Sequence, residues 1–267
     1  MKLILQVFLL TLSLFPVSLM AGTSQDSSAH RELLVHADRI VFLGDSITYN
    51  GRYVANFETW LKSLYSRRQI DVINLGLPSE TISGLSEDGH AGGRFSRPDL
   101  FTRLDSVLSK SKPSLIFACY GMNCGIYQPF DQERFSAYKQ GIEKLKKQAE
   151  ASGAKIIFIT PALFDPHGKP HPYVEVLDKY SEWLVSRRDD GWMVIDLHSH
   201  MQAALDKARK DNPSFTYQKD RVHPNTDGHW IMTQPIIRWF GDIPSSQAAS
   251  ATEIINLHKL PAGIMPL

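Results

Sequence analysis

Residues 39–45 read RIVFLGD, an apolar run that ends in a glycine and an acid and leads directly into Ser46. The run is apolar on both faces of an extended chain, which is typical of a strand buried in a parallel sheet. Further runs of this kind occupy residues 71–77, 114–121, 155–161 and 193–197. Amphipathic segments separate the runs, and this alternation predicts a parallel sheet covered by helices on both faces.

The segments between the runs carry apolar residues at helical spacing. Tyr53 and Phe57 begin one such stripe, and a longer helix is expected to start after Asp131 and to stop at Gly153. The remaining helices are expected over residues 98–108, 176–184 and 230–240. Pro235 should kink or shorten the last helix, because proline lacks the backbone N–H.

The carboxyl ends of parallel strands lie along one edge of a sheet, and ligand sites form at that edge. The residues that follow the predicted strands should therefore cluster. They are Asp45 and Ser46, residues 77–80, residues 121–124, residues 161–163, and His198.

The first 21 residues have the composition of a secretory signal peptide. Lys2 gives a basic start, an apolar stretch runs from residue 3 to residue 20, and Ala21 supplies a small residue before a polar segment. The alternative is an uncleaved membrane anchor, for which the apolar run is near the lower length limit. The pattern predicts a secreted or periplasmic protein without stable membrane insertion after cleavage, a domain over residues 35–242, and a tail over 243–267 of no evident role.

The composition is that of a neutral enzyme-sized domain. The 267 residues are 43% hydrophobic and carry a formal net charge of +1, without a polybasic run, which argues against a nucleic-acid partner. Only Cys119 and Cys124 carry thiols. Export would permit a bridge between them, but Cys119 falls in a predicted strand, where packing as a small apolar group is favoured.

Two short segments could supply a nucleophile and its base. Ser46 follows the first strand, where its hydroxyl could be exposed, although a serine there also suits a helix N-cap. Asp220 lies three residues before His223, so its carboxylate could orient the imidazole within one turn. The alternative for that segment is a surface turn before a helix. His229, on that helix, is expected to be a packing or capping residue.

Two other strand ends offer groups that could stabilise an anion. The segment 74–81 (NLGLPSET) follows the second strand, and residues 121–124 (GMNC) follow the third. A backbone N–H or the Asn123 amide could donate to a developing oxyanion. Taken alone, Asn123 would suit a turn better than a catalytic role.

Together, the segments GDSI (44–47), NLGLPSET (74–81), GMN (121–123) and DRVH (220–223) resemble the four blocks of the SGNH (GDSL-like) hydrolase family. The resemblance covers about residues 35–241. It implies a flavodoxin-like three-layer α/β/α sandwich with a five-stranded parallel sheet, which hydrolyses esters without metal or cofactor.

The resemblance also implies the role of each residue. Ser46 would be the nucleophile, His223 the base and then the acid, and Asp220 the residue that orients His223. The oxyanion hole would combine the backbone N–H groups of Ser46 and Ser79 with the Asn123 side chain.

The sequence departs from the family pattern at two positions. Ser79 stands where the second block usually has glycine, and a backbone donor there depends on the loop conformation. Cys124 stands where the third block often has aspartate, and we expect this residue to support the loop rather than the chemistry.

Two segments, 89–95 (GHAGGRF) and 125–129 (GIYQP), should border the same rim. His90, Arg94 and Tyr127 are therefore candidates for substrate contacts. The alternative is a flexible loop with incidental polar residues.

The sequence thus predicts an exported serine esterase acting on small acyl esters, O-acetyl groups in particular, of a small molecule or a glycan. A lipase, lysophospholipase or thioesterase would use the same machinery. A noncatalytic carbohydrate-binding domain is the alternative of another class, although binding alone would not need the serine, asparagine, aspartate and histidine together. Oligomeric state is left open.

Overall fold

The structure, a computed structural model, describes residues 23–241, and side chains from residue 29 onward. The predicted signal segment and the tail over 243–267 lie outside these residues. The strands are β1 (Arg39–Gly44), β2 (Asp71–Asn74), β3 (Leu115–Cys119), β4 (Lys155–Ile159) and β5 (Met193–Ile195). The α-helices are α1 (Thr23–Val35), α2 (Ser46–Asn50), α3 (Arg52–Leu64), α4 (His90–Gly93), α5 (Leu104–Ser111), α6 (Gln132–Ala151), α7 (Tyr173–Ser186), α8 (Leu197–Asp211) and α9 (Thr226–Trp239), and the 3-10 helices are η1 (Leu100–Thr102) and η2 (Arg187–Asp190).

The five strands form one parallel sheet in the order β2-β1-β3-β4-β5. In this register, Ile40 of β1 lies between Val72 of β2 and Leu115 of β3. Every residue of β3 is buried, as expected for a strand covered on both faces. The prediction of a five-stranded parallel sheet in a three-layer sandwich is confirmed.

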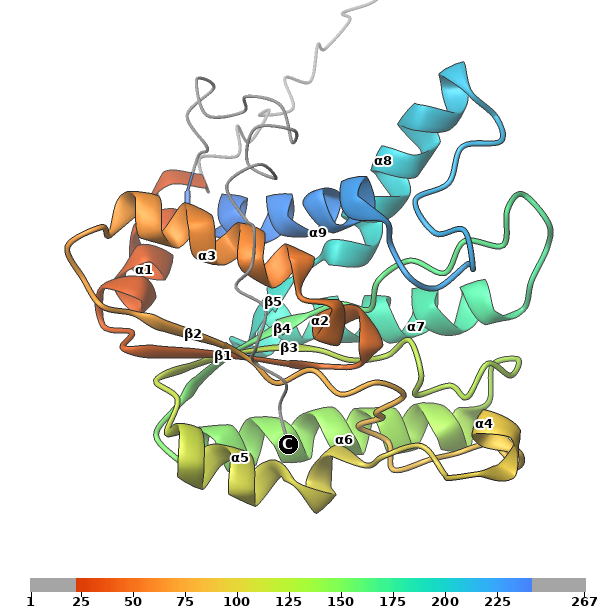
Figure 1. Ribbon diagram of the computed structural model, residues 1–267, viewed down its shortest axis with the longest axis horizontal. Helices are drawn as coiled ribbons and strands as arrows, with labels where there is room; N and C mark the ends of the chain where they lie inside the picture. Colours follow the sequence, from red (N-terminus) through yellow and green to blue (C-terminus); the bar gives the residue numbers. More distant parts are fainter. Residues whose placement is uncertain (1–22, 242–267) are drawn as a thin grey trace, which may run out of the picture.

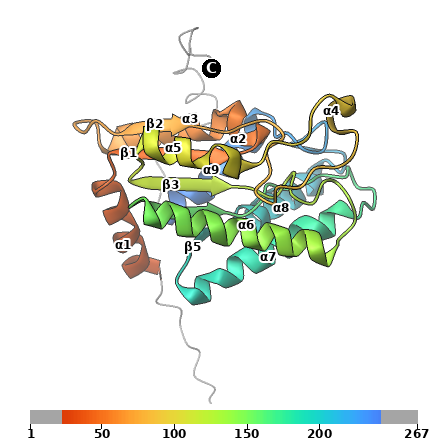
Figure 2. The same ribbon diagram turned by 90° about the horizontal axis from the view of Figure 1, so that it is seen from below.

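Helices cover both faces of the sheet (Figure 1). Helices α3, α8 and α9 lie on one face, and α5, α6 and α7 lie on the other, where they can be followed from below (Figure 2). Aromatic rings pack within and between the layers: Phe42 of β1 stacks on Phe117 of β3 at 4.6 Å between ring centroids, and Phe57 of α3 meets the Phe117 ring edge-to-face at 5.3 Å. The core is therefore continuous through the sheet and rich in aromatic rings.

Several helices differ from the sequence predictions, among them α8 and α9. Helix α8 was not predicted, and it begins directly after β5 because the Asp196 side chain accepts a hydrogen bond from Ser199 N at 3.1 Å, as an N-cap residue does. Helix α9 contains Pro235 and continues to Trp239, so the expected shortening at the proline is wrong.

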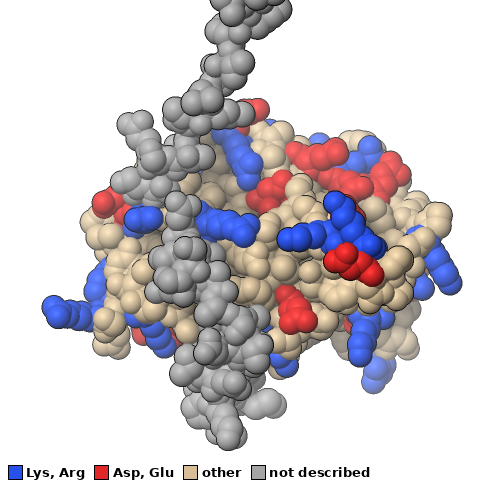
Figure 3. Space-filling model, turned by 90° about the horizontal axis from the view of Figure 1, so that it is seen from above, with Lys and Arg blue, Asp and Glu red and all other residues tan. Residues whose placement is uncertain are grey.

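The surface charge is mixed. On the face seen from above in Figure 1, Lys and Arg side chains are interspersed with Asp and Glu (Figure 3), in agreement with the small net charge. None of the helices in residues 23–241 combines the length and apolar character that a bilayer crossing requires.

Candidate active site

Ser46 opens helix α2 immediately beyond the carboxyl end of β1. Asp45 caps this helix, since its Oδ1 accepts a hydrogen bond from Ile47 N at 2.9 Å. The cap is taken by Asp45, so the Ser46 hydroxyl remains free for another partner. Burial raises the pKa of Asp45 to about 6, against the opposing hydrogen bond from Ile47 N and the neighbouring His223.

The partner of Ser46 is His223, from the segment before α9. Ser46 Oγ lies 2.8 Å from His223 Nε2, and His223 Nδ1 lies 2.6 Å from Asp220 Oδ2. Because the carboxylate can only accept, it selects the tautomer with the proton on Nδ1 and leaves Nε2 able to accept the serine proton. The structure thus brings together three side chains that are separated by up to 177 residues in the sequence.

Asp220 is held as an anion by its own turn. Its Oδ1 accepts hydrogen bonds from His223 N at 2.7 Å and Val222 N at 3.0 Å. Partial burial would raise the pKa of Asp220, but these bonds and the His223 ring outweigh it and hold the pKa below its usual value. The group that orients His223 is therefore ionised throughout the neutral range.

The turn that carries Asp220 and His223 is fastened to the loop after β4. Asp165 N donates to Arg221 O at 3.0 Å, and Gln218 Nε2 donates to the Leu163 carbonyl oxygen. The Asp165 carboxylate accepts two bonds of 2.8 Å from Arg209 Nη2 of α8. The turn that carries His223 is thereby held in place by hydrogen bonds to the β4 loop, which is in turn bonded to helix α8.

The second block lies beside α2, and Ser79 in it has a backbone conformation that usually favours glycine. Ser79 has φ 66°, in the left-handed region that favours glycine, and it adopts this conformation nonetheless. Gly76 is required for a different, steric reason, because a Cβ at this position would lie 2.3 Å from Tyr49 N of α2. The block therefore depends on close backbone approach at Gly76 and on a left-handed turn at Ser79.

The third block holds Asn123 after β3. Asn123 is buried, its Nδ2 donates to Glu80 O at 3.3 Å, and its Oδ1 accepts from the Tyr127 hydroxyl at 3.2 Å. The asparagine amide has two N–H donors, so one remains beyond the bond to Glu80. The second and third blocks are in direct contact through this side chain.

Glu80 is a structural residue of this site that sequence reasoning missed. It is fully buried, its carboxylate accepts two 2.6 Å bonds from Arg103, and it accepts a third of 2.6 Å from the Tyr120 hydroxyl. Burial raises the pKa of Glu80, although Arg103 and Tyr120 act in the opposite direction. The signal that could have found it is a carboxylate within the block NLGLPSET, whose neighbours are apolar or small.

Both cysteines are free thiols and buried. Cys124 Sγ accepts from Ile82 N at 3.5 Å, and Ser83 Oγ donates to Cys124 O at 3.3 Å, so Cys124 joins the second block to the third. Cys119 packs within β3, as the sequence favoured. Burial raises the pKa of both thiols far above the usual range.

The three residues proposed for substrate contacts have different surroundings. Tyr127 contacts Asn123. His90 Nδ1 lies 3.3 Å from Glu87 Oε1, and Arg94 Nε donates to Ala91 O at 2.9 Å, so both make these contacts within their own loop.

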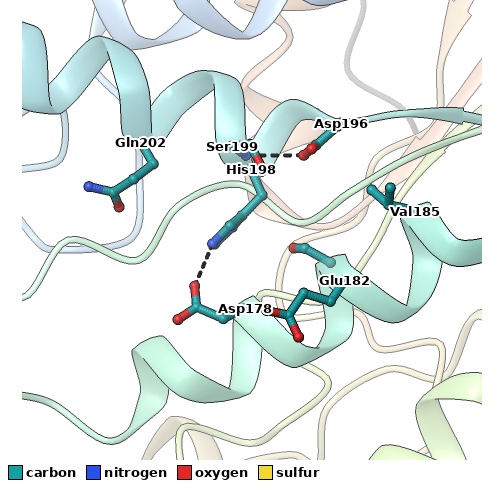
Figure 4. A pocket seen from close by; sticks show the side chains of 8 residues that line it. Asp178, Glu182, Val185, Asp196, His198, Ser199 and Gln202 are labelled. Carbon is teal, nitrogen blue, oxygen red and sulfur yellow. Dashed lines mark hydrogen bonds and ion pairs between the residues drawn. The ribbon is translucent and has the colours of Figure 1, made fainter. Parts of the chain in front are cut away.

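His198 belongs to a separate cleft between α7 and α8 (Figure 4). Its Nε2 lies 2.9 Å from Asp178 Oδ1 and its Nδ1 lies 3.3 Å from Pro161 O. The cleft has a volume of about 340 Å³ and is lined by Asp178, Ser181, Glu182, Val185, Asp196, His198, Ser199 and Gln202. His229 is buried against Tyr53, and burial lowers its pKa to about 4, as expected for a packing residue.

Within residues 23–241, no group of three or more His, Cys, Asp or Glu side chains is arranged to hold a metal ion. The groups that converge at the carboxyl ends of β1 and β3 are a hydroxyl with a basic nitrogen beside it, a carboxylate and an amide. This set can transfer an acyl group through a serine ester.

Comparison with known proteins supports this chemistry. The model of the GDSL-like Lipase/Acylhydrolase family matches residues 42–231, which contain all four sequence blocks. An acetylxylan esterase of Geobacillus stearothermophilus is 24% identical over 225 residues, covering 76% of this chain and 94% of that protein.

Solved structures share the fold. The crystal structure of Axe2, an acetylxylan esterase from Geobacillus stearothermophilus, has a TM-score of 0.61 at 23% identity and covers 77% of this chain and 95% of its own. A gut microbial diltiazem-metabolizing enzyme has a TM-score of 0.63 at 23% identity, over 76% of this chain, which spans only 46% of that enzyme. The family match covers well over half of the sequence, and the chain therefore belongs to the GDSL-like lipase/acylhydrolase family and is a serine ester hydrolase.

Proposed function

We propose that the protein is an exported esterase that removes small acyl groups, acetyl above all, from carbohydrate hydroxyls. The observation that carries the proposal is the hydrogen-bonded series from Ser46 Oγ through His223 to Asp220. The acetyl and carbohydrate parts rest on the likeness to an acetylxylan esterase. Export rests on the signal-like composition of residues 1–21.

In the proposed reaction, Ser46 Oγ forms a bond to the ester carbonyl carbon while its proton passes to His223 Nε2. The carbonyl electron pair moves to oxygen, which accepts from the backbone N–H groups of Ser46 and Ser79 and from Asn123 Nδ2. The C–O bond to the sugar then breaks, and its oxygen takes the proton from His223. Water repeats the sequence on the acyl-serine and releases the acid.

The exposure of the site suits a bulky alcohol. The His223 side chain is 47% exposed and the Asp220 side chain 56% exposed. An ester on a long glycan can approach such a site without threading into the protein.

The test is hydrolysis of p-nitrophenyl acetate, butyrate and octanoate, together with an acetylated xylo-oligosaccharide. We expect acetyl esters to be preferred, and Ser46→Ala to lower kcat by at least about a thousandfold. Ser63→Ala is the matched control, because Ser63 is an exposed serine on α3 whose hydroxyl only bonds the Trp60 carbonyl. A fluorophosphonate should label Ser46 in the parent protein and nothing in the alanine variant.

Each alternative has its own outcome. Preference for the octanoate would favour a lipase, lysophospholipase or thioesterase. Binding of the acetylated glycan without hydrolysis of any ester would favour a noncatalytic module. Retention of most turnover in the folded Ser46→Ala variant would remove the nucleophile assignment.

A further inference from the structure

The orientation of the Asn123 carboxamide is determined by its two partners. The atom that faces Glu80 O, at 3.3 Å, must be the amide nitrogen, because a carbonyl oxygen can only accept. The other end of the carboxamide, Oδ1, can only accept, so the Tyr127 hydroxyl 3.2 Å away must donate to it. Tyr127 and Glu80 O together therefore fix which way the amide nitrogen points.

Tyr127 is itself held in an unusual backbone conformation. Ile126 and Tyr127 have φ values of 48° and 55°, two successive non-glycine residues in the left-handed region. Each such residue costs about 1 kcal/mol or more, a cost that persists only where the surroundings enforce it. The enforcing contact on one face is Tyr173, whose ring stacks on Tyr127 at 4.8 Å and 24° and whose hydroxyl donates to Met122 O at 2.8 Å.

An ion pair with a buried guanidinium also contacts the Tyr127 ring. The Arg97 guanidinium lies 5.3 Å from the centre of the ring and is bound to Glu87 through two hydrogen bonds of 2.6 Å. The Arg97 side chain is only 5% exposed, whereas the Glu87 side chain is 24% exposed, so the guanidinium is the shielded member of the pair. Burial raises the pKa of Tyr127 above its usual range, which keeps the hydroxyl protonated as a donor.

We propose that Tyr127 is a positioning residue for the oxyanion hole, which acts by holding the Asn123 carboxamide and is itself clamped by the Arg97–Glu87 pair. The inference rests on the proposed function, in which Asn123 Nδ2 donates to the oxyanion. Without the Tyr127 hydroxyl, Asn123 loses its partner at Oδ1, and rotation about its broad terminal torsion moves the donor away from the reacting oxygen. In this proposal, the loop over 83–97 acts on the site through the contact of Arg97 with Tyr127 and not through contact with substrate.

The experiment is a double-mutant cycle of Tyr127→Phe and Asn123→Ala, with kcat and KM measured on p-nitrophenyl acetate. Asn123→Ala should lower kcat by about a hundredfold or more. Tyr127→Phe should lower kcat by about tenfold with little change in KM, the loss expected from one hydrogen bond that acts through a neighbour. In the Asn123→Ala background, Tyr127→Phe should change kcat by less than about twofold, because there is no carboxamide left to position.

Two further variants sharpen the test. Arg97→Gln removes the clamp and should lower kcat only in chains that retain the Tyr127 hydroxyl. Tyr138→Phe is the matched control, since Tyr138 is a buried tyrosine whose hydroxyl donates to the backbone oxygen of Tyr120 at 3.4 Å. It should leave kcat unchanged, and urea unfolding of every variant checks that the fold is retained.

The outcomes separate this inference from the proposed function. An undiminished kcat in Tyr127→Phe, or the same tenfold loss with and without Asn123, would overturn the positioning role while Asn123 kept its place. Full activity in Asn123→Ala would overturn the oxyanion assignment itself, and the positioning role with it.

Discussion

At the scale of single residues, Ser79 stands where the family resemblance leads us to expect glycine. A serine with φ 66° bears a steric cost of about 1 kcal/mol that glycine would not. We expect Ser79→Gly to keep kcat within about twofold and to raise the free energy of unfolding by about 1 kcal/mol. Urea unfolding and turnover of an acetyl ester measure the two effects.

Ser79→Ala and Ser79→Val complete this series. Alanine keeps the backbone N–H and should keep most of the activity. Valine is β-branched and fits the left-handed region poorly, so it should lower both stability and kcat. If Ser79→Ala lost as much kcat as Asn123→Ala, the Ser79 hydroxyl would take part, and a backbone-only role would be wrong.

The sequence predicted the site residues at the strand ends better than the neighbouring residues that form hydrogen bonds to them. Ser46 and Asn123 follow strands, and Asp220 reaches His223 within one turn, so local spacing suffices for each. Glu80 and Tyr127 act through contacts across 43 and 4 residues that depend on how the loops pack. No local pattern encodes such packing.

At the scale of elements, the buried Asp165–Arg209 pair connects the β4 loop, α8 and the turn before α9. Although burial acts the other way, hydrogen bonds from Thr216, Arg209 and His167 N lower the pKa of Asp165 below its usual value. A lowered carboxyl pKa contributes stability that is fully present above the unfolded pKa, near 4, and lost as pH falls through the folded pKa.

We expect Asp165→Asn to reduce the free energy of unfolding by about 3 kcal/mol at pH 7, because it leaves Arg209 without its anion. The difference from the parent protein should shrink as the pH falls below about 4, where the parent loses the same charge. Urea unfolding of the variant and the parent protein at pH 7 and below about pH 4 measures this difference in the free energy of unfolding.

Asp190→Asn is the control for this experiment, since Asp190 pairs with Arg187 at the surface and is 51% exposed. Its loss should change stability by less than about 1 kcal/mol. A variant at Asp165 no less stable than this control would show that the pair does not fasten the turn.

Among the helices, α6 was predicted from its sequence and α8 was not. Helix α6 begins after Asp131, whose side chain accepts from Arg134 N at 2.9 Å, as its sequence indicates. Helix α8 buries Met201 and Leu205 among many charged residues and packs against α9. Tertiary packing rather than propensity stabilises such a helix.

At the scale of the whole molecule, the strand order decides where the site forms. In a sheet of order 2-1-3-4-5, the connections on either side of β1 and β3 leave toward opposite faces and open a crevice at their carboxyl ends. Ser46 follows β1 and Asn123 follows β3, so the two lie at this point. The apolar runs predict parallel strands but not their order in the sheet, because adjacency in a sheet leaves no mark on a single strand.

Substitutions at the amino ends of the strands should lower stability without lowering activity, because the site lies at the carboxyl ends. Helix α1 packs beside the amino ends of the strands (Figure 2), where Leu34 is fully buried and Arg31 Nε donates to Phe240 O at 2.6 Å. We expect Leu34→Ala to lower the free energy of unfolding by about 3 kcal/mol. The value of kcat/KM should be unchanged at temperatures where the variant is folded, and a large loss there would show that α1 is coupled to the site.

The distance in sequence between Ser46 and His223 also has a consequence in time. The chain is synthesised from its amino end, so the serine emerges with the first strand, whereas the histidine precedes the last helix of the sheet domain. Helix α9 reaches the rest of the molecule through Thr233 and Thr226, which accept hydrogen bonds from Asn56 and Arg52 of α3. If the proposed mechanism holds, a growing or partly unfolded chain carries Ser46 without His223, and hydrolysis waits until the whole domain has assembled.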